Sequence, residues 1–426
     1  ILALTFTIKA ADHLKTELGD RIGEDGQKIN AMTFHSFSNG VVEEFISEIG
    51  LKKIPRLMSD ADIYFLLMER FDLIENIRSK EFRRNPAQAV KSFKRIFDVF
   101  RNNLFSKDEI DEHRKNVERK IVKCKEESEI EALNQLIDSC RVYPSYQSWK
   151  KEVGQIDFGD MILGLSKLLD DPIILLKVRQ KFKHLIVDEF QDNNYALSRI
   201  LEKISGKGGS VTVVGDDDQS IYSFRGAHIN GFTEFRKFHG NTPEYAEITL
   251  DINYRSTQPI LNFAHEVVKM NNARFKSNPL QAHLNTQNDI ILYSGDRKTQ
   301  MSKIASIIRD LKRDGLSSEN ICVLTRTRAN AVELEDFLNI NKIPTSSNLK
   351  KLFEMDSVKN FLSFVNVMYR GEYFELSLYR LLEYSNCSDI IENQNIMPKL
   401  ISYFKDGSIA KGLPVNHSTI DFLYQT

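Results

Sequence analysis

Cysteine is scarce in this sequence, which has four such residues among 426. They lie far apart, and none belongs to a Cys-x-x-Cys pair or stands at a zinc-site spacing from histidine, so we expect free thiols rather than disulfides or zinc ligands. This usage fits a reducing compartment, and we predict a cytoplasmic protein. No apolar run approaches the length of about 18 residues that a membrane-spanning helix requires, and no signal peptide is visible. The sequence therefore indicates no membrane partner.

An excess of charge of one sign is also lacking, because 58 Lys and Arg residues nearly balance 59 Asp and Glu residues. The resulting net charge of −1 excludes a uniformly basic coat, so any contact with nucleic acid has to use local grooves. A hydrophobic content of 41% is ample for several cores. A chain of this length is expected to form about two to four domains.

Polar side chains follow two apolar segments that have the composition of β-strands. Leu185–Val187 leads into Asp188 and Glu189, and Val211–Val214 leads into a Gly-Asp turn that reaches Gln219. Because parallel strands of an open α/β sheet end at the same edge, we expect these side chains to lie close together. A carboxylate there can hold Mg²⁺ through water, while its neighbour polarises the water that attacks a γ-phosphate. The Gln219 amide can donate to phosphate and accept from water.

Simpler interpretations of the same residues stay open. Taken alone, Asp188 and Glu189 are more often solvated acids at the end of a strand. The three acids Asp216 to Asp218 could instead form a loop that caps the next helix.

Hydrophobic periodicity predicts an α/β region that a helical stretch interrupts. We expect a strand at Ile1–Phe6, a helix at about Lys9–Leu18 and a second strand near Ile29–Thr33. Residues from about 56 to 145 are helical and highly charged, and their spacing favours a solvated helix face over a dedicated binding surface. The α/β pattern then resumes through the strands that end at Asp188 and Gly215.

A second α/β region begins near Glu247. Alternation of Ile248, Leu250 and Ile252 predicts a half-buried strand there. Further strands are expected at Ile290–Tyr293 and Ile321–Leu324. A helix is expected between these two strands; it ends at Gly315 and carries an apolar stripe of Ile304, Ile307, Ile308 and Leu311. A second helix is expected after them, at Val332–Leu338. Past residue 370 the pattern is helical, with an expected core of Leu376, Tyr379, Leu381 and Leu382.

Several segments resemble, in the expected order, the motifs of the UvrD/Rep group of superfamily 1 DNA helicases. His184–Asp192 and Val213–Ala227 are similar to motifs II and III of that family. The other similar segments are Ala3–Ala11 (motif Ia), Thr33–Ser36 (a DNA-contacting motif), Ile156–Asp160 (the acidic segment ahead of motif II), Leu250–Ser256 (motif IV) and Ile321–Arg326 (the strand after it). The resemblance covers residues 1 to about 370.

The resemblance implies an α/β fold with two RecA-like parallel-sheet motor domains and inserted helical subdomains. The implied divisions are residues 1–55 and 146–246 for the first motor domain, 56–145 for its helical insertion, 247–369 for a partial second motor domain and 370–426 for the start of its helical insertion.

The resemblance also implies a nucleotide site with ATP and Mg²⁺. The expected catalytic residues are Glu189, Asp188, Gln219 and Arg255, with Asp188 holding the metal through water. Nucleotide binding is assigned to Tyr254, Arg255, Gln219 and Gln191. In this scheme Arg255 reaches the γ-phosphate from the second motor domain, and Tyr254 stacks on adenine.

A structural interpretation of the Tyr254-Arg255 segment can hold at the same time. The two residues would form a turn that caps the following helix, with Ser256 or Thr257 as the N-cap and Pro259 in the first turn.

Single-stranded DNA is the second implied ligand, because aromatic platforms and backbone-contacting groups recur in the motifs. The expected DNA-binding residues are Phe6, Thr7, Phe34, His35, Tyr222, Phe224 and Arg225. The chain departs from the family twice. Ile8 stands where the family usually has Asn, which puts a polar contact in doubt, and Phe224 replaces the usual Trp with a smaller stacking face.

Parts of the family pattern are missing. No Gly-x-x-x-x-Gly-Lys-Ser/Thr loop occurs to hold the β- and γ-phosphates, and the glycines near residues 19–26 and 206–209 do not supply one. The chain begins at Ile1 without methionine and stops at Thr426 before any counterpart of motifs V and VI. We therefore expect an incomplete chain that hydrolyses ATP poorly by itself.

The implied function is that of an ATP-dependent DNA helicase or translocase, moving 3′ to 5′ and unwinding duplexes in DNA repair or recombination. Single-stranded DNA and junctions of single with double strands are the expected partners, with repair or defence proteins as further ones. One alternative is the motor subunit of a helicase-nuclease or DNA-defence complex. The other is a catalytically inactive, nucleotide-dependent DNA-binding regulator.

Overall fold

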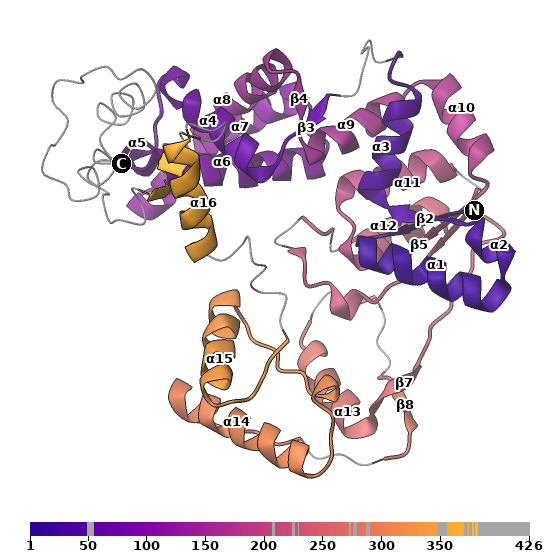
Figure 1. Ribbon diagram of the computed structural model, residues 1–426. Coiled ribbons are helices and arrows are strands. Elements are labelled where there is room, and N and C mark those ends of the chain that lie inside the picture. Colours follow the sequence, from indigo (N-terminus) through magenta and orange to yellow (C-terminus); the bar gives the residue numbers. More distant parts are fainter. Residues whose placement is uncertain are drawn as a thin grey trace, which may run out of the picture. The chain divides into compact units, whose positions relative to one another are not determined.

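The computed structural model describes residues 1–48, 55–206, 209–223, 226–228, 230–271, 274–275, 279–286, 290–346 and 356–369, together with Phe374, Ser377, Leu378, Arg380 and Leu381. The chain divides into two compact units, Ile1–Asn288 and Asp289–Thr426, and most of their helices and strands are labelled in Figure 1. Among the described residues, no helix combines the length and the hydrophobicity that crossing a bilayer requires.

A four-stranded parallel sheet lies in the first unit. Its strands are β1 (Leu2–Thr5), β2 (Asn30–Thr33), β5 (His184–Val187) and β6 (Ser210–Val213), in the order β2-β1-β5-β6. Leu2 pairs with both Asn30 and Leu185, and His184 pairs with Ser210. All four strands therefore finish at one edge, as the sequence predicted. The strands expected at residues 1–6 and 29–33 are confirmed.

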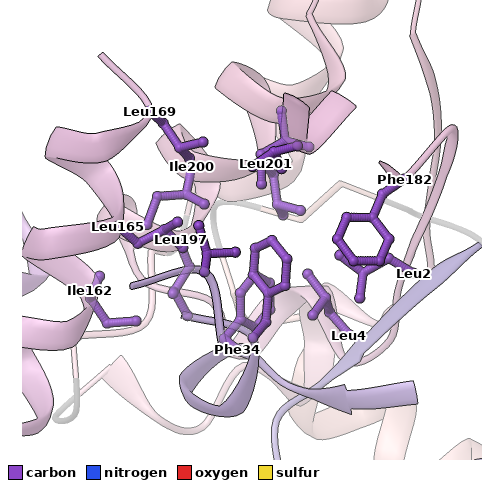
Figure 2. Close-up of a cluster of buried hydrophobic side chains, with 14 of the residues drawn as sticks. Leu2, Leu4, Phe34, Ile162, Leu165, Leu169, Phe182, Leu197, Ile200 and Leu201 are labelled. Carbon is purple, nitrogen blue, oxygen red and sulfur yellow. The ribbon is translucent and has the colours of Figure 1, made fainter. Parts of the chain in front are cut away.

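Helices pack against this sheet and close its hydrophobic core. They are α1 (Ile8–Ile22), α3 (Phe34–Glu44), α9 (Phe158–Leu168), α10 (Pro172–Lys181), α11 (Tyr195–Ser205) and α12 (Gly231–His239). The short helix α2 (Glu24–Gln27) packs against α1. Figure 2 shows Leu2 and Leu4 of β1 beside Phe34, Phe182 and residues of α9 and α11. Side chains alternate along β5, because Leu185 and Val187 are buried while His184 and Ile186 are exposed.

The helical insertion has a hydrophobic core of its own. Its elements are β3 (Arg56–Leu57), α4 (Asp60–Glu69), η1 (Phe71–Leu73), α5 (Lys80–Arg84), α6 (Pro86–Asn102), α7 (Lys107–Ile121), α8 (Glu127–Glu152) and β4 (Gln155–Ile156). Phe82, Phe93, Phe97 and Tyr146 are fully buried within it. The chain enters and leaves the insertion side by side, because β3 pairs in parallel with β4. Helix α8 continues past residue 145, since Pro144 lies inside it without ending it.

A buried ionic cluster ties this insertion to α9. Asp157, the N-cap of α9, accepts hydrogen bonds from the Tyr146 hydroxyl (2.6 Å) and the Lys150 ammonium (2.8 Å), and it pairs with Arg101. Arg101 also pairs with Asp98. The acidic segment Ile156–Asp160 thus has a structural role, because its first carboxylate pairs with two buried cations.

The first unit also contains the segment that follows residue 246. Strand β7 (Ile252–Thr257) pairs in parallel with β8 (Gln281–Leu284), and α13 (Gln258–Val268) connects them. The predicted half-buried strand is only partly correct, because β7 begins at Ile252. Ile248 and Leu250 are 85% and 76% exposed.

The second unit contains helices α14 (Arg297–Arg313), α15 (Arg328–Ile340) and α16 (Asp356–Met368), with η5 (Ser318–Asn320). Ala305 and Ile308 of α14 pack with Leu334 and Leu338 of α15. The two helices expected here are confirmed, and Gly315 has the positive φ of 90° that favours glycine after a helix.

The strands expected at residues 290–293 and 321–324 are wrong for this structure. Neither segment forms a strand among the described residues, and Leu292 and Leu324 are each 90% exposed. A strand needs a hydrogen-bonding neighbour, and the described part of this unit supplies none to them. Of the expected core beyond residue 370, Leu381 is buried, while Leu376, Tyr379 and Leu382 lie outside the described residues. The α/β class, with parallel sheets and inserted helices, is confirmed.

Candidate functional site

Asp188 and Glu189 lie at the carboxyl edge of the sheet, directly after β5. The Asp188 N–H donates to the Leu4 carbonyl at 3.0 Å, and the Asp188 carboxylate accepts from the Glu189 N–H at 3.0 Å. Glu189 has φ 50° and ψ 46°, the left-handed region that residues other than glycine rarely occupy. Such a conformation costs on the order of 1–3 kcal/mol and tends to occur at functional sites. The strain therefore marks Glu189 as a candidate functional residue.

Gln191 connects the ends of β5 and β6. Its amide nitrogen donates to the Glu189 carboxylate at 2.5 Å, and its amide oxygen accepts from the Asp216 N–H at 3.0 Å. The side chain is buried, with 5% of its surface exposed. Gln191 was expected to bind nucleotide, but both ends of its amide here contact protein. The Gln191 amide therefore fixes the position of the Glu189 carboxylate, and nucleotide binding by Gln191 stays a prediction.

Gly215 makes this close approach possible. A Cβ atom at this position would lie 2.4 Å from the Gln191 amide oxygen and 3.0 Å from the Phe190 backbone nitrogen. The first distance is shorter than real Cβ contacts, and the second is tighter than most of them, so a side chain here would force its neighbours to shift. The Gly-Asp turn after β6 is therefore required by packing against the loop that carries Glu189.

Gln219 ends a short 3₁₀ helix, Asp217–Gln219, which Asp216 caps. The Asp216 carboxylate accepts from the Asp218 N–H at 3.1 Å and from the Gln219 amide nitrogen at 2.8 Å. The capping interpretation of the acidic run is thus correct for Asp216. It does not exclude phosphate binding, because Gln219 remains exposed.

Arg255 and Tyr254 lie on β7, which leads into α13 through the N-cap Thr257, with Pro259 in the first turn as expected. The Asn253 side chain accepts from the Arg255 N–H at 2.9 Å and so fixes the backbone. Tyr254 is 67% exposed, with its ring 4.7 Å from that of His283. In the described part of the chain, no hydrogen bond or ion pair joins the exposed Arg255 to Asp188 or Glu189. The predicted convergence of these groups on one nucleotide stays a prediction.

Two aromatic pairs occur among the expected DNA-binding residues. The rings of Phe6 and Tyr222 stack with centroids 5.8 Å apart and an angle of 19°. His35 meets Phe158 edge to face at 5.7 Å, and Phe158 is 51% exposed. Part of the His35 ring is accessible, while packing around the rest desolvates it and lowers the pKa of His35. Sequence reasoning missed Phe158, whose only signal was its aromatic ring at the start of α9.

The other expected DNA-binding residues do not take part in these aromatic pairs. Thr7 caps α1 by accepting a hydrogen bond from the Ala10 N–H at 3.1 Å. Phe34 requires a correction, because its ring is 3% exposed and packs in the core of the sheet, where it cannot stack on a base (Figure 2). Phe224 and Arg225 lie outside the described residues.

Comparison with known proteins agrees with the motifs. Residues 1–240 match the UvrD/REP helicase N-terminal domain, and residues 248–397 match the UvrD-like helicase C-terminal domain. The chain is 29% identical over 387 residues to the ATP-dependent DNA helicase PcrA of Staphylococcus aureus strain Mu50, covering 90% of this chain and 49% of that protein. It is 28% identical, over the same shares, to PcrA of Staphylococcus epidermidis strain ATCC 12228. The chain thus spans about half the length of these curated relatives, and it belongs to the UvrD/Rep helicase family.

Proposed function

We propose that this chain is part of the motor of an ATP-dependent DNA helicase or translocase that moves 3′ to 5′ on single-stranded DNA. The observation that supports it most directly is the hydrogen-bonded group of Glu189, Gln191, Asp216 and Gln219 at the carboxyl edge of a parallel sheet. Open α/β sheets bind their ligands at this edge. The polarity, and a role in DNA repair or recombination at single-strand to double-strand junctions, rest on membership of the family.

Asp188 fits the expected magnesium ligand. Its carboxylate is partly exposed, accepts one backbone hydrogen bond, and has no cationic partner among the described residues. Mg²⁺ bound there through water would neutralise charge on the β- and γ-phosphates. Glu189 would take a proton from the attacking water, and the Gln191 amide holds that carboxylate in place. Gln219 would contact phosphate, and Arg255 would stabilise the charge that develops in transfer.

Replacing Glu189 by Gln tests this proposal in the full-length protein. The amide oxygen of the new side chain can still accept from Gln191, so folding and the binding of ATP and of an oligonucleotide should be retained. Turnover of ATP should fall by at least about a hundredfold, because the amide cannot act as a base. Glu24→Gln on the exposed helix α2 is the matched control and should behave as wild type. Near-normal turnover of Glu189→Gln would remove Glu189 from this role.

The alternatives give different results in the same assays. A catalytically inactive regulator would show no DNA-stimulated ATP hydrolysis in the wild-type protein. The motor of a helicase-nuclease or DNA-defence complex would hydrolyse ATP but need partner proteins for unwinding. Unwinding of a partial duplex with a 3′ tail, and not of one with a 5′ tail, would support the stated polarity. The 426-residue chain alone should hydrolyse ATP poorly.

A further inference from the structure

Arg274 forms a two-pronged ion pair with Asp218, the residue before Gln219. Its Nε lies 2.8 Å from Asp218 Oδ1, and its Nη2 lies 2.7 Å from Asp218 Oδ2. Both side chains are almost buried, with 13% and 11% of their surfaces exposed. Parallel contacts of this kind fix orientation as well as distance, because the guanidinium and the carboxylate are both planar.

Phe275 adds a second attachment at the same place. Its backbone N–H donates to the Asp217 carboxylate at 2.5 Å. Its ring lies under the Arg236 guanidinium of α12, 4.0 Å from carbon to ring centroid, and 5.5 Å from the Phe232 ring. The carboxylates of Asp216, Asp217 and Asp218 lie within 4.8 Å of one another, yet two of them are already used by residues 274 and 275. We therefore interpret this acidic cluster as a docking point for the chain itself.

An unbroken series of hydrogen bonds joins this docking point to Glu189. The Asp218 N–H donates to the Asp216 carboxylate, and the Asp216 N–H donates to Gln191 at 3.0 Å. Gln191 in turn donates to the Glu189 carboxylate. Gln219 joins the series through its own bond to Asp216. The turn that presents Gln219 cannot move without breaking the Arg274 pair or moving residue 274 with it.

The position of Arg274 in the chain shows which segments its ion pair with Asp218 connects. It follows α13, and α13 follows β7, which carries Tyr254 and Arg255. One ion pair thus fastens the segment that carries Arg255 to the turn that carries Gln219. Coupling between sites requires a physical element that both sites contact, and this turn bonds to Arg274 on one side and to Gln191 on the other.

We propose that Arg274 is a positioning residue that, through Asp218, sets the geometry of Gln219 and Glu189 and couples it to the chain segment after α13. The inference rests on the proposed function, because it concerns the efficiency of the same site. A purely structural ion pair would instead affect stability and leave turnover per folded molecule unchanged.

The test compares ATP turnover, the KM for ATP and the melting temperature in the full-length protein with saturating oligonucleotide. Arg274→Ala should lower kcat by about tenfold or more with KM changed by less than about threefold. Arg274→Lys keeps the charge but loses the fork, so it should fall between Arg274→Ala and wild type. Arg313→Ala, which removes an exposed ion pair with Asp310, is the matched control and should match wild type.

A double variant tests whether Arg274 acts through the catalytic group. If it does, Arg274→Ala should cause little further loss of turnover in the Glu189→Gln background, whereas independent effects would multiply. Should Arg274→Ala fold poorly, Arg274→Gln combined with Asp218→Asn replaces the pair by neutral groups and should show the same fall in kcat. Wild-type kcat in folded Arg274→Ala, or multiplicative losses, would overturn the inference while leaving the proposed function intact. An inactive wild-type protein would instead refute the proposed function.

Discussion

Removing one buried charge, that of Asp157, should destabilise the junction between the helical insertion and α9. Asp157 is 1% exposed and faces two cations, Arg101 and Lys150, that are 3% and 2% exposed. Asp157→Asn keeps the size of the side chain and an oxygen that can cap α9. It removes the negative charge, and it replaces the oxygen that accepts from Tyr146 and Lys150 by an NH2 group that can only donate. Leaving buried ions uncompensated costs about 3–5 kcal/mol.

The neighbouring acids set the size of this effect. Arg101 keeps its pair with Asp98, and Lys150 keeps its pair with Asp160. We therefore expect the lower end of the range, a fall of about 3 kcal/mol in the free energy of unfolding at neutral pH.

The single tryptophan of the chain makes the measurement local. Trp149 is 8% exposed in the core of the insertion, next in sequence to Lys150, so its fluorescence during urea unfolding reports on this region. Asp171→Asn is the matched control, because Asp171 also caps a helix but lies on the surface without a cationic partner among the described residues. That change should cost less than about 0.5 kcal/mol. A loss below about 1 kcal/mol for Asp157→Asn would refute the reasoning, since it would mean that the two cations do not need the charge.

The same carboxylate should also make stability depend on pH. Burial alone would raise the pKa of Asp157, but the charges of Arg101 and Lys150 and the hydrogen bonds from Lys150 and Tyr146 lower it from 3.8 to about 2. A pKa lowered by folding adds stability that is complete above the unfolded value and is lost as the pH falls through the folded value. The shift corresponds to about 2 kcal/mol. The difference between wild type and Asp157→Asn should therefore shrink between about pH 4 and pH 2.

Four further substitutions test the site. Gly215→Ala should lower the free energy of unfolding by about 1–3 kcal/mol and should also lower ATP turnover, because its methyl group would clash with Gln191. Thermal unfolding and ATPase assays measure the two effects. Gly40→Ala is the control and should show neither loss, because no atom lies within 4 Å of the new methyl group. Phe34→Ala should cost about 3–5 kcal/mol of unfolding free energy by denaturant titration, and weaker oligonucleotide binding without that loss would contradict its place in the core. Phe6→Ala and Phe224→Ala should each weaken oligonucleotide binding by about 1 kcal/mol or more, as measured by fluorescence anisotropy. Phe263→Ala is the control, because Phe263 is an exposed aromatic residue of α13. Unchanged affinity of the Phe6 or the Phe224 variant would mean that the ring in question packs against protein and does not contact DNA.

Sequence patterns predicted the sheet edge well, because the relevant signals are local. Short β-branched runs ended in acids at Asp188 and in a glycine turn at Gly215, and both lie where expected. The helices with a regular apolar stripe, such as α14, were predicted for the same reason. A single apolar residue at the end of a strand, by contrast, does not reveal whether its side chain is buried or exposed. Phe34 therefore matched a DNA-contacting motif while its ring packs inside the core.

Interactions between distant residues could not be predicted. Arg274 stands 56 positions after Asp218, and no local pattern links a lone arginine to an acid at that distance. The strands expected at residues 290–293 and 321–324 failed for a related reason. Their apolar alternation describes a side-chain preference, whereas a strand also depends on a neighbour that the sequence pattern does not identify.

The left-handed Glu189 is held in place by hydrogen bonds to the backbone on both of its sides. On one side, the Asp188 N–H bonds the Leu4 carbonyl of β1, and on the other, the Phe190 N–H bonds the Val214 carbonyl at 2.9 Å. Two neighbouring strands thus fix the chain immediately before and after Glu189, and Gln191 fixes its carboxylate. Strain of about 1–3 kcal/mol persists only where the surroundings determine the backbone so completely. The sheet therefore holds the Glu189 carboxylate of the candidate site in a fixed position, and substrate binding would not require free energy to order it.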